Sequence, residues 1–294
     1  MTLDPLLQLP GVEDAVERAR VACEELRWHE AYRRRWREVR AEAGLRATRA
    51  SAELEGARVP LSVVRSLATA PTADDEPVVA GALRATVVVE ELMPALGARG
   101  AAPLPPFGQV LARVHAAATG SWLADEHVGR LRTDLPPADL TGLGPALTGA
   151  ELAARVDLLA STVASSRAPA LVVAAVVHGE LLTLRPFRAG NGVVARAMAR
   201  LMVSARGLDP TGSLVESWSL NPYLGAAAGF ATGTPDGVAR WIWASASDRD
   251  RVRCSVAGTW KYSSAATSRP RRSSSSRSPK PGLPMSAASL QRTT

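Results

Sequence analysis

Apolar residues recur at helical spacing in one segment of this chain after another, and no long segment alternates apolar with polar residues. Alternation is what a half-buried strand requires, whereas recurrence every three or four residues gives a helix one apolar face. The pattern therefore predicts an all-α domain that leaves room for one small hairpin. We expect helices over residues 12–43, 47–55, from Pro60 onward, and over 75–96, 105–119, 149–164, 168–184, 193–206 and 236–247.

Glycines mark the predicted ends of several of these helices. Gly44 is expected to stop the helix over 12–43, and Gly56 the helix over 47–55, because glycine best tolerates the left-handed conformation that often ends a helix. Residues 121–144 collect proline, glycine and aspartate and lack a helical period, so they are predicted to form a loop that could include the hairpin.

Composition indicates a chain that can bury a core. Hydrophobic residues make up 46% of the 294 residues, which excludes wholesale disorder, and the 4% of aromatics imply an aliphatic core. The longest apolar run, over 168–177, is too short to span a bilayer. An acid at Asp4 does not suit a secretory signal, and two cysteines form no framework. We therefore expect a cytoplasmic protein without a membrane segment.

The basic character of the chain is confined to its C-terminal end. Residues 251–294 hold nine basic and no acidic residues, so subtracting them from the net charge of +7 leaves −2 for residues 1–250. The serine-, arginine- and proline-rich residues 249–294 are predicted to be disordered. Nucleic acid is thus not expected to bind except through this tail. The alternatives are a basic arm for nucleic acid or membrane and, as we favour, a dispensable tail.

The segment LRPFRAGNGVVAR, residues 184–196, is typical of a phosphate-binding turn. Gly190 and Gly192 allow the backbone to approach a ligand closely, and Asn191 enters the left-handed region readily. The following helix offers unpaired N–H groups and its positive dipole end to an anion. Arg196, one turn further on, is expected to reach the same anion.

Two motifs in this chain are similar to motifs of one family. Residues 185–196 resemble the H-P-F-x-D/E-G-N-G-R-x-x-R signature of Fic (Fido-fold) proteins, and residues 51–56, SAELEG, resemble the S/T-x-x-x-E-G motif of their inhibitory helix. The positions in register are Pro186, Phe187, Gly190, Asn191, Gly192 and Arg196, with Ser51, Glu55 and Gly56. His178, Tyr223 and Trp241 lie in further similar stretches. The resemblance covers about residues 45–248.

The resemblance implies an all-α core with a small β-hairpin flap that moves AMP from ATP onto a hydroxyl of a target protein. It implies that the histidine of the motif is the general base and that the acidic residue at its D/E position binds Mg²⁺. The glycine turn and the two arginines of the motif would hold the phosphates. The flap, here within 121–144, would dock an unknown target protein, and family members often form homodimers. The implied division is a helical region over 1–99 with an inhibitory-type helix near 47–56, a Fic/Fido-like core over 100–248, and the tail over 249–294.

Three positions depart from that signature. Arg185 stands in place of the histidine and cannot accept a proton near neutrality, and losing a base typically forfeits about 10²–10⁴ in rate. Ala189 replaces the acid, so Mg²⁺ is doubtful and no metal site is expected. Val193 replaces the first arginine. We therefore expect little or no ordinary AMP transfer, with ATP or phosphate binding retained.

One alternative is an active nucleotidyl- or phosphoryl-transferase that uses water or a non-standard base, with Arg185 and Arg196 neutralising phosphates. Another is a partner or nucleic-acid binder that acts through the tail. Among other polar candidates, His178 shares a helix face with Arg185 but is more simply a core histidine. The remaining candidates have weaker grounds: His115 and His127 are expected to be structural or solvent-facing, Glu180 is a metal candidate by proximity only, and His29 has no partner at metal-ligand spacing.

Glu55 has a further implied role. In relatives with this motif, the glutamate contacts the second motif arginine and blocks productive ATP binding. Both residues are present here, as Glu55 and Arg196, although the catalytic residues are not. We hypothesise that the pair is now a structural clasp between the N-terminal helix and the loop.

Overall fold

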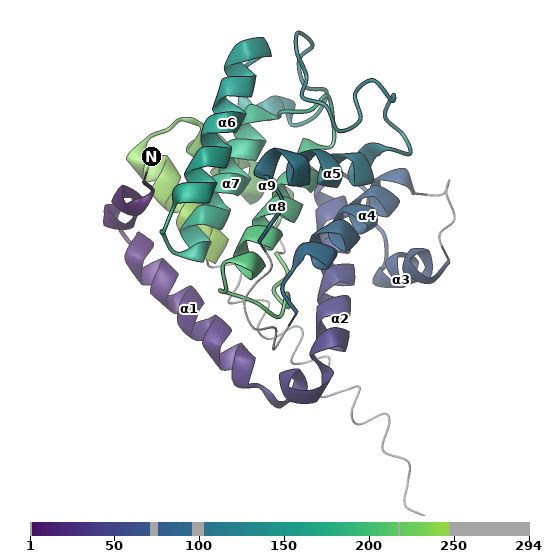
Figure 1. The fold of residues 1–294 in the computed structure, drawn as a ribbon, viewed down its shortest axis with the longest axis vertical. Coiled ribbons are helices and arrows are strands. Elements are labelled where there is room, and N and C mark those ends of the chain that lie inside the picture. The colour runs from purple at the N-terminus through teal and green to yellow at the C-terminus, as the bar shows by residue number, and fades with distance from the viewer. Residues whose placement is uncertain (1, 71–75, 96–102, 217, 247–294) are drawn as a thin grey trace, which may run out of the picture.

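The computed structural model describes residues 2–70, 76–95, 103–216 and 218–246, and these ranges contain helices and loops but no strand (Figure 1). The prediction of an all-α fold is thus confirmed, whereas the predicted tail over 249–294 lies outside the described residues. The helices are η1 (Asp4–Gln8), α1 (Val12–Trp28), α2 (Glu30–Leu54), α3 (Leu61–Thr69), α4 (Pro77–Leu92), α5 (Phe107–Thr119), η2 (Thr141–Leu143), α6 (Gly149–Ser165), α7 (Ala170–Leu184), α8 (Asn191–Ala205) and α9 (Leu220–Ala231), followed by a helical segment over 235–246.

The predicted single helix over 12–43 is wrong, because the chain changes direction at His29. This residue takes an extended backbone with φ −64° and ψ 137°, so α1 ends there and α2 begins at an angle to it (Figure 1). Helix α2 then runs through Gly44 and includes the predicted helix over 47–55 up to Leu54. A Cβ at Gly44 would lie 2.2 Å from Oε1 of Glu90 on α4, so this glycine permits close helix packing and does not stop the helix. The predicted stop at Gly56 is confirmed by its φ of +92°.

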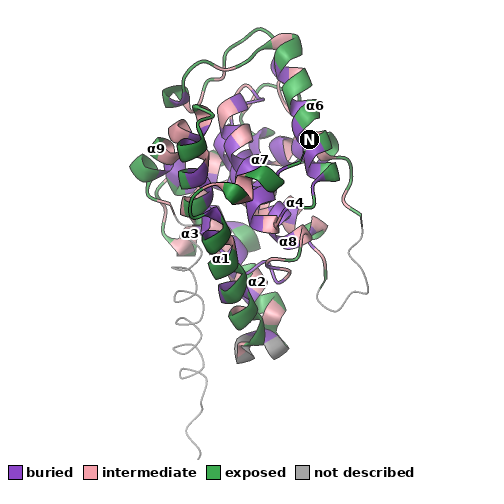
Figure 2. Cartoon of the chain, turned by 90° about the vertical axis from the view of Figure 1, so that its left-hand side faces the viewer, coloured by how far each residue is buried: buried purple, intermediate pink, exposed green. Residues whose placement is uncertain are grey.

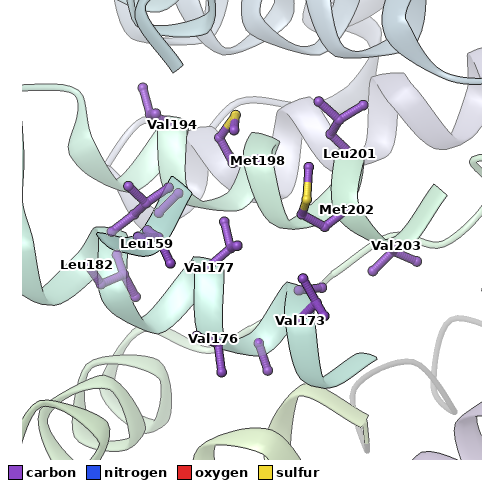
Figure 3. Packing of buried hydrophobic residues seen from close by; sticks show 14 of the residues in the cluster. Leu159, Val173, Val176, Val177, Leu182, Val194, Met198, Leu201, Met202 and Val203 are labelled. Atoms are coloured by element: carbon purple, nitrogen blue, oxygen red, sulfur yellow. The ribbon is translucent and has the colours of Figure 1, made fainter. Parts of the chain in front are cut away.

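Helix α7 lies at the centre of the fold. Every residue from Leu171 to Gly179 is buried, as expected for a helix that is apolar on all faces (Figure 2). Its partner is α8, and Figure 3 shows Val177 of α7 close to Met198 of α8 within the main cluster of buried side chains. The loop that connects these two helices is residues 185–190. It is therefore held between two rigid, buried elements.

A close helix contact elsewhere in the core gives a first testable prediction. A Cβ at Gly81 on α4 would lie 2.0 Å from the backbone oxygen of Ala118 on α5, and neither backbone can yield without moving a helix. We expect Gly81→Ala to lower the free energy of unfolding by about 1–3 kcal/mol. The control is Gly108→Ala on α5, where a Cβ meets nothing within 4 Å. Urea unfolding of both variants tests this, and equal stability of the two would contradict it.

The predicted hairpin within 121–144 is not present, since these residues are described and contain only turns and η2. Some backbone donors of this segment close local turns, such as His127 to Ala124, and two others pair with the α7–α8 loop. The N–H of Arg132 donates to the carbonyl of Pro186 at 2.9 Å, and the N–H of Ala138 donates to that of Arg188 at 2.7 Å. We call residues 132–144 the covering segment, because they run along this loop.

Candidate functional site

Two residues with positive φ shape the α7–α8 loop. Arg185 ends α7 in the left-handed conformation, with φ +44° and ψ 63°. Gly190 has φ +78° and precedes the first residue of α8. A Cβ at Gly190 would also lie 2.6 Å from Cγ2 of Thr119, so glycine is required both for conformation and for space. The loop therefore directs the N-terminus of α8 toward the covering segment.

Asn191 connects the turn to the covering segment. Its Oδ1 accepts the N–H of Phe187 at 2.9 Å, and its Nδ2 donates to the carbonyl of the same residue at 2.9 Å. Its backbone N–H donates to Oδ2 of Asp139 at 2.8 Å, and its Nδ2 also donates to Oδ1 of Asp139 at 2.7 Å. The N-terminus of α8 thus already holds an anion, which is a carboxylate from the same chain.

Sequence reasoning missed Asp139. The only signal was that residues 121–144 are rich in aspartate, and this did not distinguish Asp139 from Asp134 or Asp125. In the structure, burial raises the pKa of Asp139, and the two hydrogen bonds from Asn191 act in the opposite direction. The carboxylate is therefore partly desolvated and depends on Asn191 for its hydrogen bonds.

His115 holds the other side of the loop. Its ring lies parallel to that of Phe187, with centroids 3.8 Å apart and 9° between planes. The N–H of Gly129 donates to Nδ1 at 2.9 Å, so the ring proton is on Nε2, which donates to the carbonyl of Ala189 at 3.0 Å. Burial lowers the pKa of His115 to about 4. His115 is a neutral structural residue here, as expected from the sequence.

The side chain of Arg185 does not face an open phosphate position. It is only 2% exposed, and its guanidinium donates to the carbonyls of Leu140 at 2.9 Å and Gly144 at 2.6 Å. Burial lowers the pKa of Arg185. In the structure its donors are directed at the covering segment, and this arrangement does not favour the alternative in which Arg185 neutralises a phosphate.

Arg196 joins α8 to α2. It donates to Oε1 of Glu55 at 2.6 Å, to Oγ of Ser51 at 2.9 Å and to the carbonyl of Ser51 at 3.1 Å. The side chain of Arg196 is 7% exposed and that of Glu55 is 17% exposed. A Cβ at Gly192 would lie 2.2 Å from Oε1 of Glu55, so this carboxylate sits directly over the first turn of α8. Two motifs that are far apart in the sequence thus meet at one point.

A chain of hydrogen bonds continues from Arg196 into the core. Nη1 of Arg196 donates to the hydroxyl of Tyr223 at 3.2 Å, and this hydroxyl lies 2.9 Å from Nε2 of His178. Nδ1 of His178 is 3.7 Å from Oε2 of Glu216. Burial raises the pKa of Tyr223 to about 12. The structure thus places His178 in a buried network behind Arg196.

The other sequence candidates lie elsewhere. Glu180 forms an ion pair with Arg155 at 2.7 Å, His127 is half-buried in the loop after α5, and His29 is at the corner between α1 and α2. Within the described ranges, no three histidine, cysteine or acidic residues gather where they could hold a metal.

The donor set and the volume of the site determine which ligands it fits. Ala189 provides no carboxylate, and both oxygens of Asp139 already accept N–H groups, so the donor set does not fit Mg²⁺. A cavity beside Arg196, lined also by Val193 and Arg200, has a volume of about 50 Å³, far less than the hundreds of Å³ of an ordinary ligand site. As it stands, this cavity has no room for a nucleotide.

The chain is similar to Fic proteins in sequence and in fold. Residues 109–203 match the family model described as Fic/DOC family. A Fic family protein from Desulfovibrio desulfuricans G20 superposes with a TM-score of 0.66 at 18% identity, over 85% of this chain and 75% of that one. Fic-1 (residues 134–508) from C. elegans superposes with a TM-score of 0.64 at 16% identity, over 88% of this chain and 76% of that one.

A Fic-domain signalling protein from Bacteroides thetaiotaomicron gives a TM-score of 0.62 at 14% identity, over 83% of this chain and 98% of that one. No curated protein sequence matches the chain significantly. In the part of the chain that the structure describes, none of the helices combines the length and the apolarity needed to cross a bilayer.

Proposed function

We propose, for a chain that carries a Fic/DOC family domain over residues 109–203, a role in binding the phosphates of a nucleotide without ordinary AMP transfer. Fic family proteins generally transfer AMP or other nucleotide groups onto proteins, and this chain has the glycine turn and the second of the two arginines that the family resemblance assigns to phosphate binding. The proposed site lies between the N-terminus of α8 and the guanidinium of Arg196.

One observation carries this proposal: both anion-binding features of the site hold a carboxylate. Asp139 accepts the first N–H of α8, and Glu55 accepts from the fork of Arg196. Helix N-termini and arginine forks bind phosphate by the same chemistry with which they bind carboxylate. A phosphate chain would therefore find donors already directed at its oxygens, once the two carboxylates have moved away.

The reactive half of the machinery is missing from the same site. Arg185 cannot take a proton from a target hydroxyl, and its donors already bind carbonyls. His115 and His178 are both buried in hydrogen-bonded positions, so neither is a base that a target hydroxyl could reach. No observation favours a non-standard base, and we do not propose a transferase.

A protein partner would meet the site from the side of the covering segment. Leu135 in this segment is 50% exposed. Just outside the segment, Leu131 is 38% exposed and Leu147 is 40% exposed. Exposed leucines beside a binding loop are suited to contact with an apolar partner surface. We place the docking of an unidentified target or partner protein here.

The nucleotide-binding proposal predicts a gain of affinity in Glu55→Gln. Glutamine can still accept a hydrogen bond from Arg196 but lacks the charge of Glu55, so it holds the arginine fork less tightly, and ATP is expected to bind at least about tenfold more tightly than to the wild type. Calorimetry on the full chain with ATP, ADP and GTP, with and without Mg²⁺, measures this. Because Ala189 provides no metal-binding carboxylate, Mg²⁺ is expected to change the affinity for these nucleotides little.

The matched control is Glu53→Gln, which removes the same charge from an exposed pair with Arg49 on α2. It is expected to bind ATP like the wild type. Adding Arg196→Lys to Glu55→Gln keeps the charge but not the fork, and should abolish the gain. A Glu55→Gln protein that unfolds cooperatively but binds none of the three nucleotides would sink the proposal.

A further inference from the structure

We infer that Asp139 is an internal anion that closes the N-terminus of α8, and that Arg185 fastens the segment that carries it. This closure is separate from the one by Glu55, because it comes from the loop after α5 and not from α2. It rests on the proposed function, since the ligand that it excludes is a phosphate group.

Asp139 occupies the position that an anion would take on α8. Both its oxygens face Asn191, one toward the backbone N–H at 2.8 Å and one toward the side-chain amide at 2.7 Å. A phosphate bound at this helix end needs the same N–H group. The carboxylate and a phosphate therefore compete for one donor, and they cannot both be bound.

Arg185 holds the covering segment in place on either side of η2. Its guanidinium donates to Leu140, the residue after Asp139, and to Gly144. The bond from the N–H of Ala138 to Arg188 fixes the chain just before Asp139. The backbone on both sides of the carboxylate is thus attached to the α7–α8 loop. The arginine at the family's histidine position has become an anchor for this closure.

The backbone at this contact is strained. Leu140 has φ +52° and Arg185 has φ +44°, and of the residues that the structure describes these are the two non-glycine residues with positive φ. Such conformations are unfavourable for residues that carry a Cβ, and they gather at clamps and switch regions. The two strained residues are joined by the hydrogen bond from Arg185 to Leu140. Opening the segment would relieve strain, which opposes the hydrogen bonds that hold it closed.

The charge of Glu55 also acts on Asp139. It contributes to raising the pKa of Asp139, so the two carboxylates repel each other across the first turn of α8. This repulsion weakens the hold of Asp139 on the N-terminus of α8.

The test measures binding of inorganic phosphate and inorganic triphosphate to the full chain by calorimetry. Asp139→Asn is expected to bind both about tenfold more tightly than the wild type, since the closed state loses its charged cap. The matched control Asp134→Asn removes an exposed charge from the same segment and is expected to change nothing. Arg185→Lys is expected to tighten binding as well, because it weakens the anchor. A folded Asp139→Asn protein with wild-type affinity for both anions would overturn the inference.

A second measurement does not depend on any variant. Saturating inorganic phosphate is expected to speed hydrogen exchange of the amides in residues 140–144 of the wild-type chain, because Asp139 leaves α8. Unchanged exchange at saturation would overturn the closure by Asp139.

The two proposals fail in different ways. If Asp139→Asn gains affinity for inorganic phosphate while Glu55→Gln binds no nucleotide, the closure stands and the proposed nucleotide site fails. If Glu55→Gln binds ATP while Asp139→Asn shows no gain with either anion, the nucleotide site stands and the closure fails.

Discussion

Glu55→Gln is expected to lower the free energy of unfolding by about 3–5 kcal/mol, because it leaves the buried guanidinium of Arg196 without its counter-charge. The side chain of Arg196 is 7% exposed, so water cannot replace the lost carboxylate. Ser51 and Tyr223 still accept hydrogen bonds from Arg196, which places the expected loss toward the lower end of that range. This is the behaviour of a clasp between α2 and α8.

Urea unfolding of the wild type and of Glu55→Gln at pH 7 measures this loss. Glu53→Gln serves again as the control, because its partner Arg49 is a surface residue and exposed pairs contribute about 0–1 kcal/mol. The clasp hypothesis is wrong if Glu55→Gln unfolds at the same denaturant concentration as the wild type. Together with the gain in ATP affinity, the expected loss would mean that one contact both stabilises the fold and closes the site.

The stability of the wild type is expected to fall as the pH drops from about 6.5 to about 4, with a contribution of about 3 kcal/mol from His115. The sign follows from the lowered pKa of the folded state. Within this window the unfolded chain takes up a proton on His115, whereas the folded protein does not, so acid favours unfolding. The contribution is fully present above pH 6.5 and is lost as the pH falls toward 4.

His115→Gln provides the measurement that isolates this residue. Glutamine can donate and accept hydrogen bonds but does not titrate between pH 4 and 7. The free energy of unfolding of the variant should therefore depend less on pH than that of the wild type. The difference in free energy of unfolding between the two proteins, followed by urea unfolding at several pH values, should narrow by about 3 kcal/mol across the window. A constant difference would show that His115 does not resist protonation in the folded state.

The parts of the fold that follow from neighbouring residues could be predicted. Helices α7 and α8 begin and end within about two residues of the predicted bounds, because their apolar spacing and the Gly190-Asn191-Gly192 turn are local features. The resemblance to two family motifs, each of them a short local pattern, points to Glu55 and Arg196, and these side chains are in contact in the structure.

The role of a glycine or an extended residue could not be predicted in the same way. Gly44 looks like a helix stop in the sequence, but in the structure it faces Glu90 on α4 and the helix continues. The break at His29 has no proline or glycine to mark it. Whether a glycine ends a helix or packs against another one depends on a neighbour that is distant in the sequence.

The all-α architecture and the turn before α8 follow from the sequence alone, since each depends on residue types at local spacing. What fills the site depends on the tertiary structure. The covering segment pairs with the α7–α8 loop and forms no hairpin, Arg185 donates to Leu140, and Asp139 caps α8. Buried donors must find acceptors wherever the fold brings them, and here those acceptors lie about 50 residues away along the chain.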